Sequence, residues 1–119
     1  MAREKPSQYR TQNLKSGRLP DFLVIGGMRC GSTTLHKVLS AHPRLFLPKQ
    51  KELHFFDSYN PDLAENLGAY QQVFRPEQPN QLCGEVTPDY LTTPQAFDNI
   101  SQTLRQPKII VILRDPIER

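Results

Sequence analysis

The chain has 119 residues, and its 15 Lys and Arg against 12 Asp and Glu give a formal net charge of +3. This length accommodates one domain at most. The sequence lacks the run of about 20 apolar residues that a membrane helix needs and the apolar stretch of a signal peptide. Its composition excludes collagen, coiled coils and disulfide scaffolds. The two cysteines, Cys30 and Cys83, favour a reducing compartment.

The positive charge is concentrated at the N-terminus. Residues 1–20 contain five basic residues and one acidic residue, so the rest of the chain is slightly acidic. Residues 1–20 also lack apolar periodicity, which predicts a basic, flexible N-terminal arm. Aromatic residues do not interleave with the basic ones as they do on a nucleic-acid stacking surface. We therefore interpret the arm as a solubilising leader and expect no nucleic-acid partner.

From residue 21 onward, apolar segments of strand type alternate with segments of helical periodicity. In chain order the predicted elements are a strand at 22–25, a helix at 31–41, a strand at 45–47, a helix at 62–73, a strand at 82–86, a helix from Pro94 and a strand at 108–113. The helix from Pro94 has Thr93 as its predicted N-cap, and Phe97, Ile100 and Leu104 share one of its faces. The last strand is apolar and β-branched at most positions and is the strongest of the set. The alternation predicts an α/β fold with a parallel sheet flanked by helices.

The connection between the first strand and the first helix has the composition of an anion-binding loop. Residues 26–33 read GGMRCGST, or G-x-x-x-x-G-S-T, whereas a Walker loop carries Lys at the position of Ser32. The glycines allow backbone N–H groups to converge, the helix N-terminus adds positive charge, and Arg29 supplies a cation. The sequence therefore predicts a site for a phosphate-like anion. Because this site lacks the Walker lysine, we do not expect it to hydrolyse Mg·ATP in the ordinary way.

Residues 22–35 (FLVIGGMRCGSTTL) resemble the phosphosulfate-binding loop of sulfotransferases that use 3′-phosphoadenosine 5′-phosphosulfate (PAPS). Three further segments resemble the same family in the same order. KELHFFD (51–57) is similar to the K/N-E-x-H-F-F-D segment of the heparan-sulfate and bacterial branch, GEVTPDYL (84–91) to E-x-[ST]-P-x-Y, and KIIVILRDPIER (108–119) to the R-D-P-x-E-R segment that binds the 3′-phosphate. The resemblance implies a P-loop NTPase-like fold, with residues 21–119 as the N-terminal portion of a truncated sulfotransferase domain.

The resemblance also implies a donor site that requires no metal. Arg29 stands where the family commonly has Lys and keeps the positive charge. Arg114 falls where the family binds the 3′-phosphate, and Val86 stands where some glycan-acting members have Lys, which weakens an assignment to heavily sulfated polysaccharides. The residues that fall in the loop for the 5′-phosphosulfate are Arg29, Cys30, Gly31, Ser32, Thr33 and Thr34.

Sulfuryl transfer needs positioning, cations at the leaving oxygen and a base for the acceptor proton. Arg29 is the expected catalytic cation, and Glu52 falls at the base position of the resembling branch. His54 is the competing base, because residues 52 and 54 of an extended segment point to the same side. Two structural alternatives stay open: Glu52 as a solvated acid beside Lys51, and His54 as a buried histidine bonded to backbone.

The resemblance implies a sulfotransferase that moves a sulfuryl group from PAPS to a hydroxyl or amine of a small molecule or glycan, releasing 3′-phosphoadenosine 5′-phosphate (PAP). One alternative is a P-loop nucleotide kinase or NTPase, in which Asp115 after the strand 108–113 would be the Mg²⁺ ligand. Another alternative is an inactive nucleotide-binding fragment. We expect a cytoplasmic, bacterial protein with no membrane partner.

Overall fold

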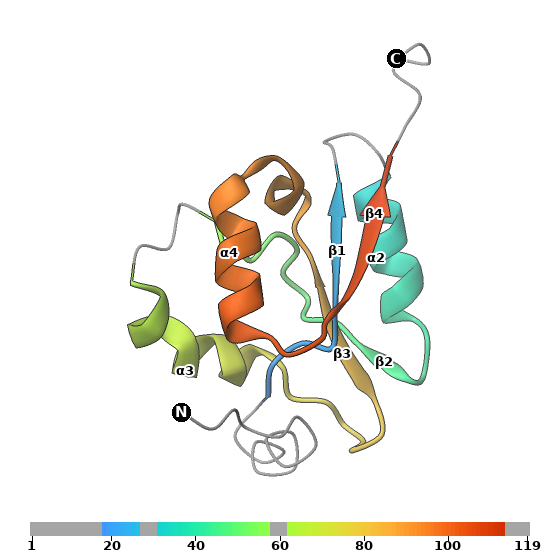
Figure 1. Cartoon of the computed structure of the whole chain (residues 1–119). Helices are drawn as coiled ribbons and strands as arrows, with labels where there is room; N and C mark the ends of the chain where they lie inside the picture. The colour runs from blue at the N-terminus through green and yellow to red at the C-terminus, as the bar shows by residue number, and fades with distance from the viewer. Residues whose placement is uncertain (1–17, 27–30, 58–61, 114–119) are drawn as a thin grey trace.

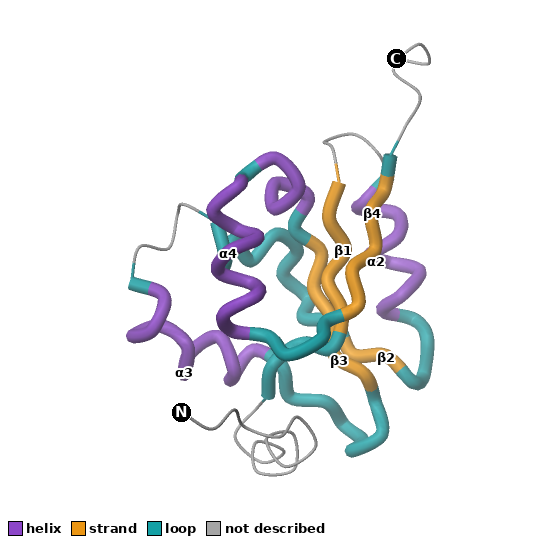
Figure 2. The backbone as a smooth tube through the Cα atoms, viewed as in Figure 1, coloured by secondary structure: helices purple, strands orange, loops and turns teal. Residues whose placement is uncertain are grey.

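The computed structural model describes residues 18–26, 31–57 and 62–113. The described chain forms a four-stranded sheet in the order β2-β3-β1-β4, and every pair of neighbouring strands is parallel (Figures 1 and 2). In chain order the elements are β1 (Phe22–Gly26), α2 (Ser32–Ser40), β2 (Leu45–Phe46), α3 (Leu63–Val73), β3 (Leu82–Val86), the short 3₁₀ helix η1 (Pro88–Thr92), α4 (Pro94–Thr103) and β4 (Lys108–Ile112). The predicted α/β class and the predicted elements are confirmed.

The central strand β1 separates two apolar layers. Leu23 and Ile25 face a cluster built with α3 and α4, whereas Phe22 and Val24 face a second cluster that includes side chains of α2. Successive side chains of a strand point to opposite faces, so a strand that is covered on both sides is apolar at every position. Figure 1 shows the resulting three layers, with α3 and α4 on one side of the sheet and α2 on the other.

The residues just before β1 are firmly attached to the sheet. Arg18, counted above with the basic arm, is buried, and its guanidinium donates to the Sγ of Cys83 at 3.3 Å and to the carbonyl oxygen of Gln81. The guanidinium also lies 3.5 Å from the carboxylate of Asp21. Residues 1–17 of the predicted arm lie outside the described residues.

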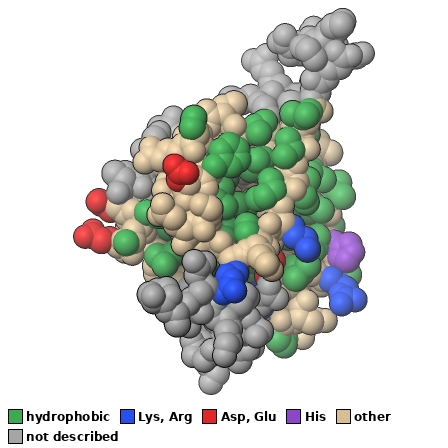
Figure 3. Space-filling model, viewed as in Figure 1, with side chains coloured by type: hydrophobic (Ala, Val, Ile, Leu, Met, Phe, Trp, Pro, Cys, Tyr) green, Lys and Arg blue, Asp and Glu red, His purple; other side chains and the backbone are tan. Residues whose placement is uncertain are grey.

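Among the described strands β4 lies at an edge of the sheet and pairs with β1, and its apolar side chains are partly uncovered. Ile109 and Val111 are 43% and 46% exposed, and Figure 3 shows apolar side chains gathered over β4 and beside α4. On α4 the buried positions are Ala96 and Ile100, whereas Phe97, expected on the packed face, is 45% exposed. No helix within the described residues combines the length and apolar character needed to cross a membrane.

The C-terminal ends of the parallel strands β1 and β3 lie at the same edge of the sheet. Because β1 and β3 run parallel with Phe22 opposite Gly84 and Val24 opposite Val86, the segments that follow the two strands leave the sheet side by side. The predicted anion-binding loop follows β1, and the T-P-x-Y segment follows β3. The fold therefore brings two of the four motif segments to the same edge.

We expect Gly84→Ala to destabilise the fold by about 1–3 kcal/mol, the usual cost of overpacking. A Cβ at Gly84 would lie 2.1 Å from Cζ of Phe22, which is buried between the sheet and α2. Gly68→Ala is the matched control, because a Cβ in the middle of α3 meets nothing within 4 Å and should stabilise the helix by about 0.5–1 kcal/mol. Urea unfolding measures both. Equal shifts of the two midpoints would contradict the packing described for Phe22.

Candidate active site

The N-terminus of α2 forms one wall of the site. Gly31 occupies its N-cap with φ of 87°, a left-handed conformation that favours glycine. Gly31 has no side chain with which to cap the helix, so among the described residues no capping side chain accepts from the N–H groups of the first turn, and an outside acceptor could bind there. Ser32 is nearly buried, while Thr33 and Thr34 are exposed. The other predicted donor-site residues, Arg29, Cys30 and Arg114, lie outside the described residues.

Lys51 brings a cation to this helix end from a different segment. Its Nζ lies 3.2 Å from Oγ of Ser32 and 2.7 Å from Oε2 of Glu52. Ser32 replaces the Walker lysine in the sequence, so Lys51 restores a positive charge beside the loop in space. Sequence reasoning missed this role and treated Lys51 only as a neighbour of Glu52. A useful signal was present, since a lysine sat directly before the candidate base in a motif segment.

Glu52 and His54 lie in an irregular segment, so the expectation of an extended backbone was wrong. Both residues adopt left-handed conformations, with φ of 63° and 57°, a region that residues other than glycine enter rarely. Their side chains nevertheless meet, with Oε1 of Glu52 3.5 Å from Nε2 of His54. The two candidate bases therefore belong to one cluster rather than to separate sites.

The cluster continues from His54 to Asp57. Nδ1 of His54 lies 2.6 Å from Oδ2 of Asp57, whose side chain is almost completely buried. The alternative of a fully buried histidine is wrong, since His54 is partly exposed, and its ring contacts two carboxylates. Lys51, Glu52, His54 and Asp57 thus form a chain of alternating charge when His54 is protonated.

The charges set the protonation states of the two candidate bases in opposite directions. The hydrogen bond from Lys51 lowers the pKa of Glu52 and outweighs the effect of partial burial. Burial alone would lower the pKa of His54, but the hydrogen bond to Asp57 and the charges of Asp57, Asp89 and Glu52 together raise it. Glu52 is therefore kept ionised, while His54 is biased toward the protonated form.

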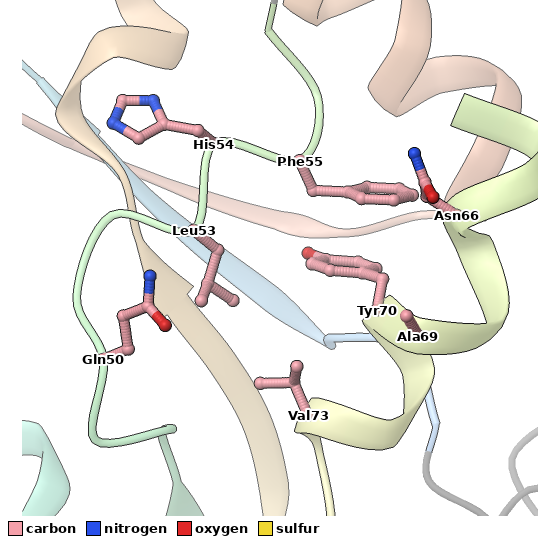
Figure 4. A pocket seen from close by; sticks show the side chains of 8 residues that line it. All are labelled: Gln50, Leu53, His54, Phe55, Asn66, Ala69, Tyr70 and Val73. Carbon is pink, nitrogen blue, oxygen red and sulfur yellow. The ribbon is translucent and has the colours of Figure 1, made fainter. Parts of the chain in front are cut away.

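Two further features border the cluster. His54, Asp57 and Asp89 each offer one ligand atom, and these atoms lie within 4.8 Å of one another, so the three side chains could also surround a cation. A hollow of about 390 Å³ opens between the segment 50–55 and α3. In Figure 4 the stacked rings of Phe55 and Tyr70 and the amide of Asn66 border this hollow, with His54 at its rim.

No model of a known protein family matches the chain. The chain is 36% identical over 101 residues to the membrane-associated sulfotransferase kil1 of Dictyostelium discoideum, covering 85% of this chain and 21% of kil1. It is 34% identical over 105 residues to the heparan sulfate glucosamine 3-O-sulfotransferase 3B1 of Homo sapiens, covering 87% of this chain and 26% of that protein. The chain thus spans about a fifth to a quarter of the length of these curated relatives.

A solved structure gives the same comparison in three dimensions. The fold is similar to that of a sulfotransferase from Alicyclobacillus acidocaldarius, with a TM-score of 0.71 and 28% identity. The similarity covers 84% of this chain and 46% of the other. The described sheet and helices are therefore those of part of a larger known fold.

We expect the imidazole of His54 to titrate above its ordinary pKa of 6.5, and Asp57→Asn to lower that pKa. Because the folded pKa is raised, the stability contributed by His54 is fully present below about pH 6.5 and is lost as the pH rises through the folded pKa. Titration of the ring protons by NMR measures this directly. The control is Asp98→Asn, which removes an exposed acid on α4. A His54 pKa that falls equally in both variants would contradict the role of Asp57.

Proposed function

We propose that this chain, which its sequence and fold relate to the sulfotransferases, binds PAPS and takes part in transferring its sulfuryl group to a hydroxyl or amine acceptor. One observation carries the proposal: Lys51 contacts both Ser32 at the N-terminus of α2 and the carboxylate of Glu52. An anion-binding helix end, a cation and a candidate base are therefore adjacent. The relatives in sequence and in structure favour this function over the nucleotide kinase alternative.

The donor fits the residues around the start of α2. Gly31, Ser32, Thr33 and Thr34 present backbone N–H groups and hydroxyls, and the positive end of the helix dipole favours an anion there. We assign the 5′-phosphosulfate to this end, together with Arg29 and Cys30, and the 3′-phosphate to Arg114. PAPS supplies the sulfuryl group. Lys51 and Arg29 act as cations that stabilise the negative charge developing on the departing oxygen.

Glu52 is the better candidate for the base. A base must be unprotonated at the moment it accepts the acceptor proton, and the hydrogen bond from Lys51 favours the ionised form of Glu52. His54 is biased toward its protonated form by Asp57 and the other nearby acids. In the proposed step the acceptor oxygen or nitrogen bonds to sulfur, its proton passes to Glu52, and the bond from sulfur to the phosphate oxygen breaks. His54 then serves to hold the Glu52 carboxylate in place.

The acceptor class is proposed from the relatives. The human relative is named for the glucosamine of heparan sulfate, which supports a carbohydrate acceptor for this chain. Val86, where some glycan-acting members have Lys, is buried in the apolar layer under α2, so it offers no charge to a sulfated chain. We therefore propose a carbohydrate with few sulfates. A cytoplasmic location and the division into an arm at 1–20 and a partial domain at 21–119 remain predictions.

Titration with PAP and with Mg·ATP tests the donor. We expect PAP to bind and Mg·ATP to bind far more weakly, because the Walker lysine position holds Ser32. Isothermal titration calorimetry measures both, and addition of EDTA should leave PAP binding unchanged. Tight binding of Mg·ATP without binding of PAP would overturn the proposal in favour of a kinase or NTPase.

Replacement of Glu52 tests the base. Glu52→Gln should lower the rate of sulfuryl transfer by about 10²–10⁴-fold, the usual contribution of general base catalysis, while PAP affinity survives. Transfer from labelled PAPS to a glucosamine-containing oligosaccharide gives the rate, and Glu65→Gln, an exposed acid on α3, is the control. An unchanged rate in Glu52→Gln would move the role of base to His54. Binding of PAP with no transfer by the unaltered chain would identify an inactive fragment.

A further inference from the structure

Glu85 is a buried carboxylate that the proposed reaction does not use. It lies on β3 with 1% of its surface exposed, and three hydroxyl groups donate hydrogen bonds to it. Thr87 donates to Oε1 at 2.6 Å, Tyr90 donates to Oε2 at 3.1 Å, and Tyr70 of α3 donates to Oε2 as well. Burial raises the pKa of Glu85, and its ionised form only accepts hydrogen bonds. In that form each of the three hydroxyls directs its single hydrogen toward Glu85.

Two of these hydroxyls also hold the segment that carries the candidate bases. The backbone N–H of Leu53 donates to Oγ1 of Thr87 at 3.0 Å, and the N–H of Phe55 donates to the hydroxyl oxygen of Tyr90 at 2.8 Å. A hydroxyl has one hydrogen and two lone pairs. Because Glu85 takes the hydrogen, the lone pairs of Thr87 and Tyr90 face the backbone N–H groups of the segment 53–56.

The held segment is the one with the unusual backbone. Leu53 and Phe55 alternate with Glu52 and His54, which both have positive φ. Such conformations persist only where the surrounding structure imposes them. The N–H of Glu52 itself donates to the carbonyl oxygen of Val86 at 2.7 Å. The N–H of Phe56 also donates to the hydroxyl oxygen of Tyr90, at 3.3 Å. The end of β3 and the residues after it therefore hold four N–H groups within five consecutive residues.

We infer that Glu85 is a positioning residue: through Thr87 and Tyr90 it fixes the backbone of residues 53–56 and so holds the side chains of Glu52 and His54 together, with Glu52 in contact with Lys51. The inference rests on the proposed function only where it expects an effect on sulfuryl transfer. The hydrogen bonds that hold the segment do not depend on that function. Tyr70 differs from the other two donors, because its hydroxyl contacts Glu85 but accepts no N–H from this segment in the described structure.

Glu85→Gln tests whether Glu85 controls the hydrogen bonds that the backbone N–H groups of Leu53 and Phe55 donate to the hydroxyl oxygens of Thr87 and Tyr90. The amide nitrogen of Gln donates, so one of the two hydroxyls must turn its hydrogen away from residue 85 and toward the segment. We expect hydrogen exchange at the amides of Leu53 and Phe55 to rise about tenfold relative to Leu23 of β1, the change that loss of about one hydrogen bond produces. Unchanged exchange at both amides would overturn the inference.

Matched variants separate positioning from simple loss of stability. Thr87→Val should accelerate exchange at Leu53, whereas Thr87→Ser keeps the hydroxyl and should restore slow exchange. Tyr70→Phe removes a donor to the same carboxylate and should leave exchange at Leu53 and Phe55 unchanged relative to Leu23. If Tyr70→Phe accelerates the two amides as much as Glu85→Gln does, Glu85 acts through general stability and the inference fails.

The transfer assay separates this inference from the proposed function. We expect Glu85→Gln and Thr87→Val to lower kcat about tenfold with PAP affinity unchanged, and Thr87→Ser to recover the rate. If the unaltered chain shows no transfer, the proposed function of this chain fails, while the exchange measurements still decide the positioning role. If the amides are released and kcat stays unchanged, the placement of Glu52 and His54 does not depend on Glu85, which overturns the inference.

Discussion

Parallel pairing on both sides of β1 is the constraint on which the rest of the site depends. Pairing with β3 on one side and β4 on the other aligns the ends of three strands, and a parallel sheet exposes its connecting segments at that edge. At Gly26 the backbone approaches β4 so closely that a Cβ would lie 2.5 Å from the carbonyl oxygen of Ile112. A side chain at Gly26 would therefore collide with β4, and glycine allows the two strands to pair at this point.

Buried hydroxyls link the fold to the chemistry of the site. Thr87 and Tyr90 each join the apolar interior, a buried carboxylate and the backbone of an irregular segment. A buried carboxylate is costly unless its hydrogen-bonding capacity is filled, and here three hydroxyl donors surround it. The same bonds that make Glu85 tolerable inside the protein also hold Glu52 and His54 in conformations that they would not adopt alone.

The sequence predicted the regular elements well because their signals are local. Apolar runs and helical spacing located β1, β3 and α2 within a residue or two. The site was predicted only in part, since Glu52 and Ser32 were identified while Lys51 was not. The contact from Lys51 to Ser32 joins residues 19 positions apart. The segment with left-handed backbone at Glu52 and His54 is held by the end of β3 and the residues after it, which are more than 30 positions away. Neither feature leaves a local pattern in the sequence.

Lys51 links anion binding at the N-terminus of α2 to the proton affinity of Glu52. One ammonium group contacts both the helix end and the carboxylate of Glu52. An anion that draws Lys51 toward Ser32 weakens the field that keeps the pKa of Glu52 low and adds negative charge of its own, so the carboxylate becomes a stronger base. By thermodynamic linkage, a proton on Glu52 then strengthens the hold on the anion. If the donor binds at Ser32 and Glu52 is the base, as proposed, donor occupancy and base strength are coupled through a single side chain, and the base gains proton affinity only when there is a group to transfer.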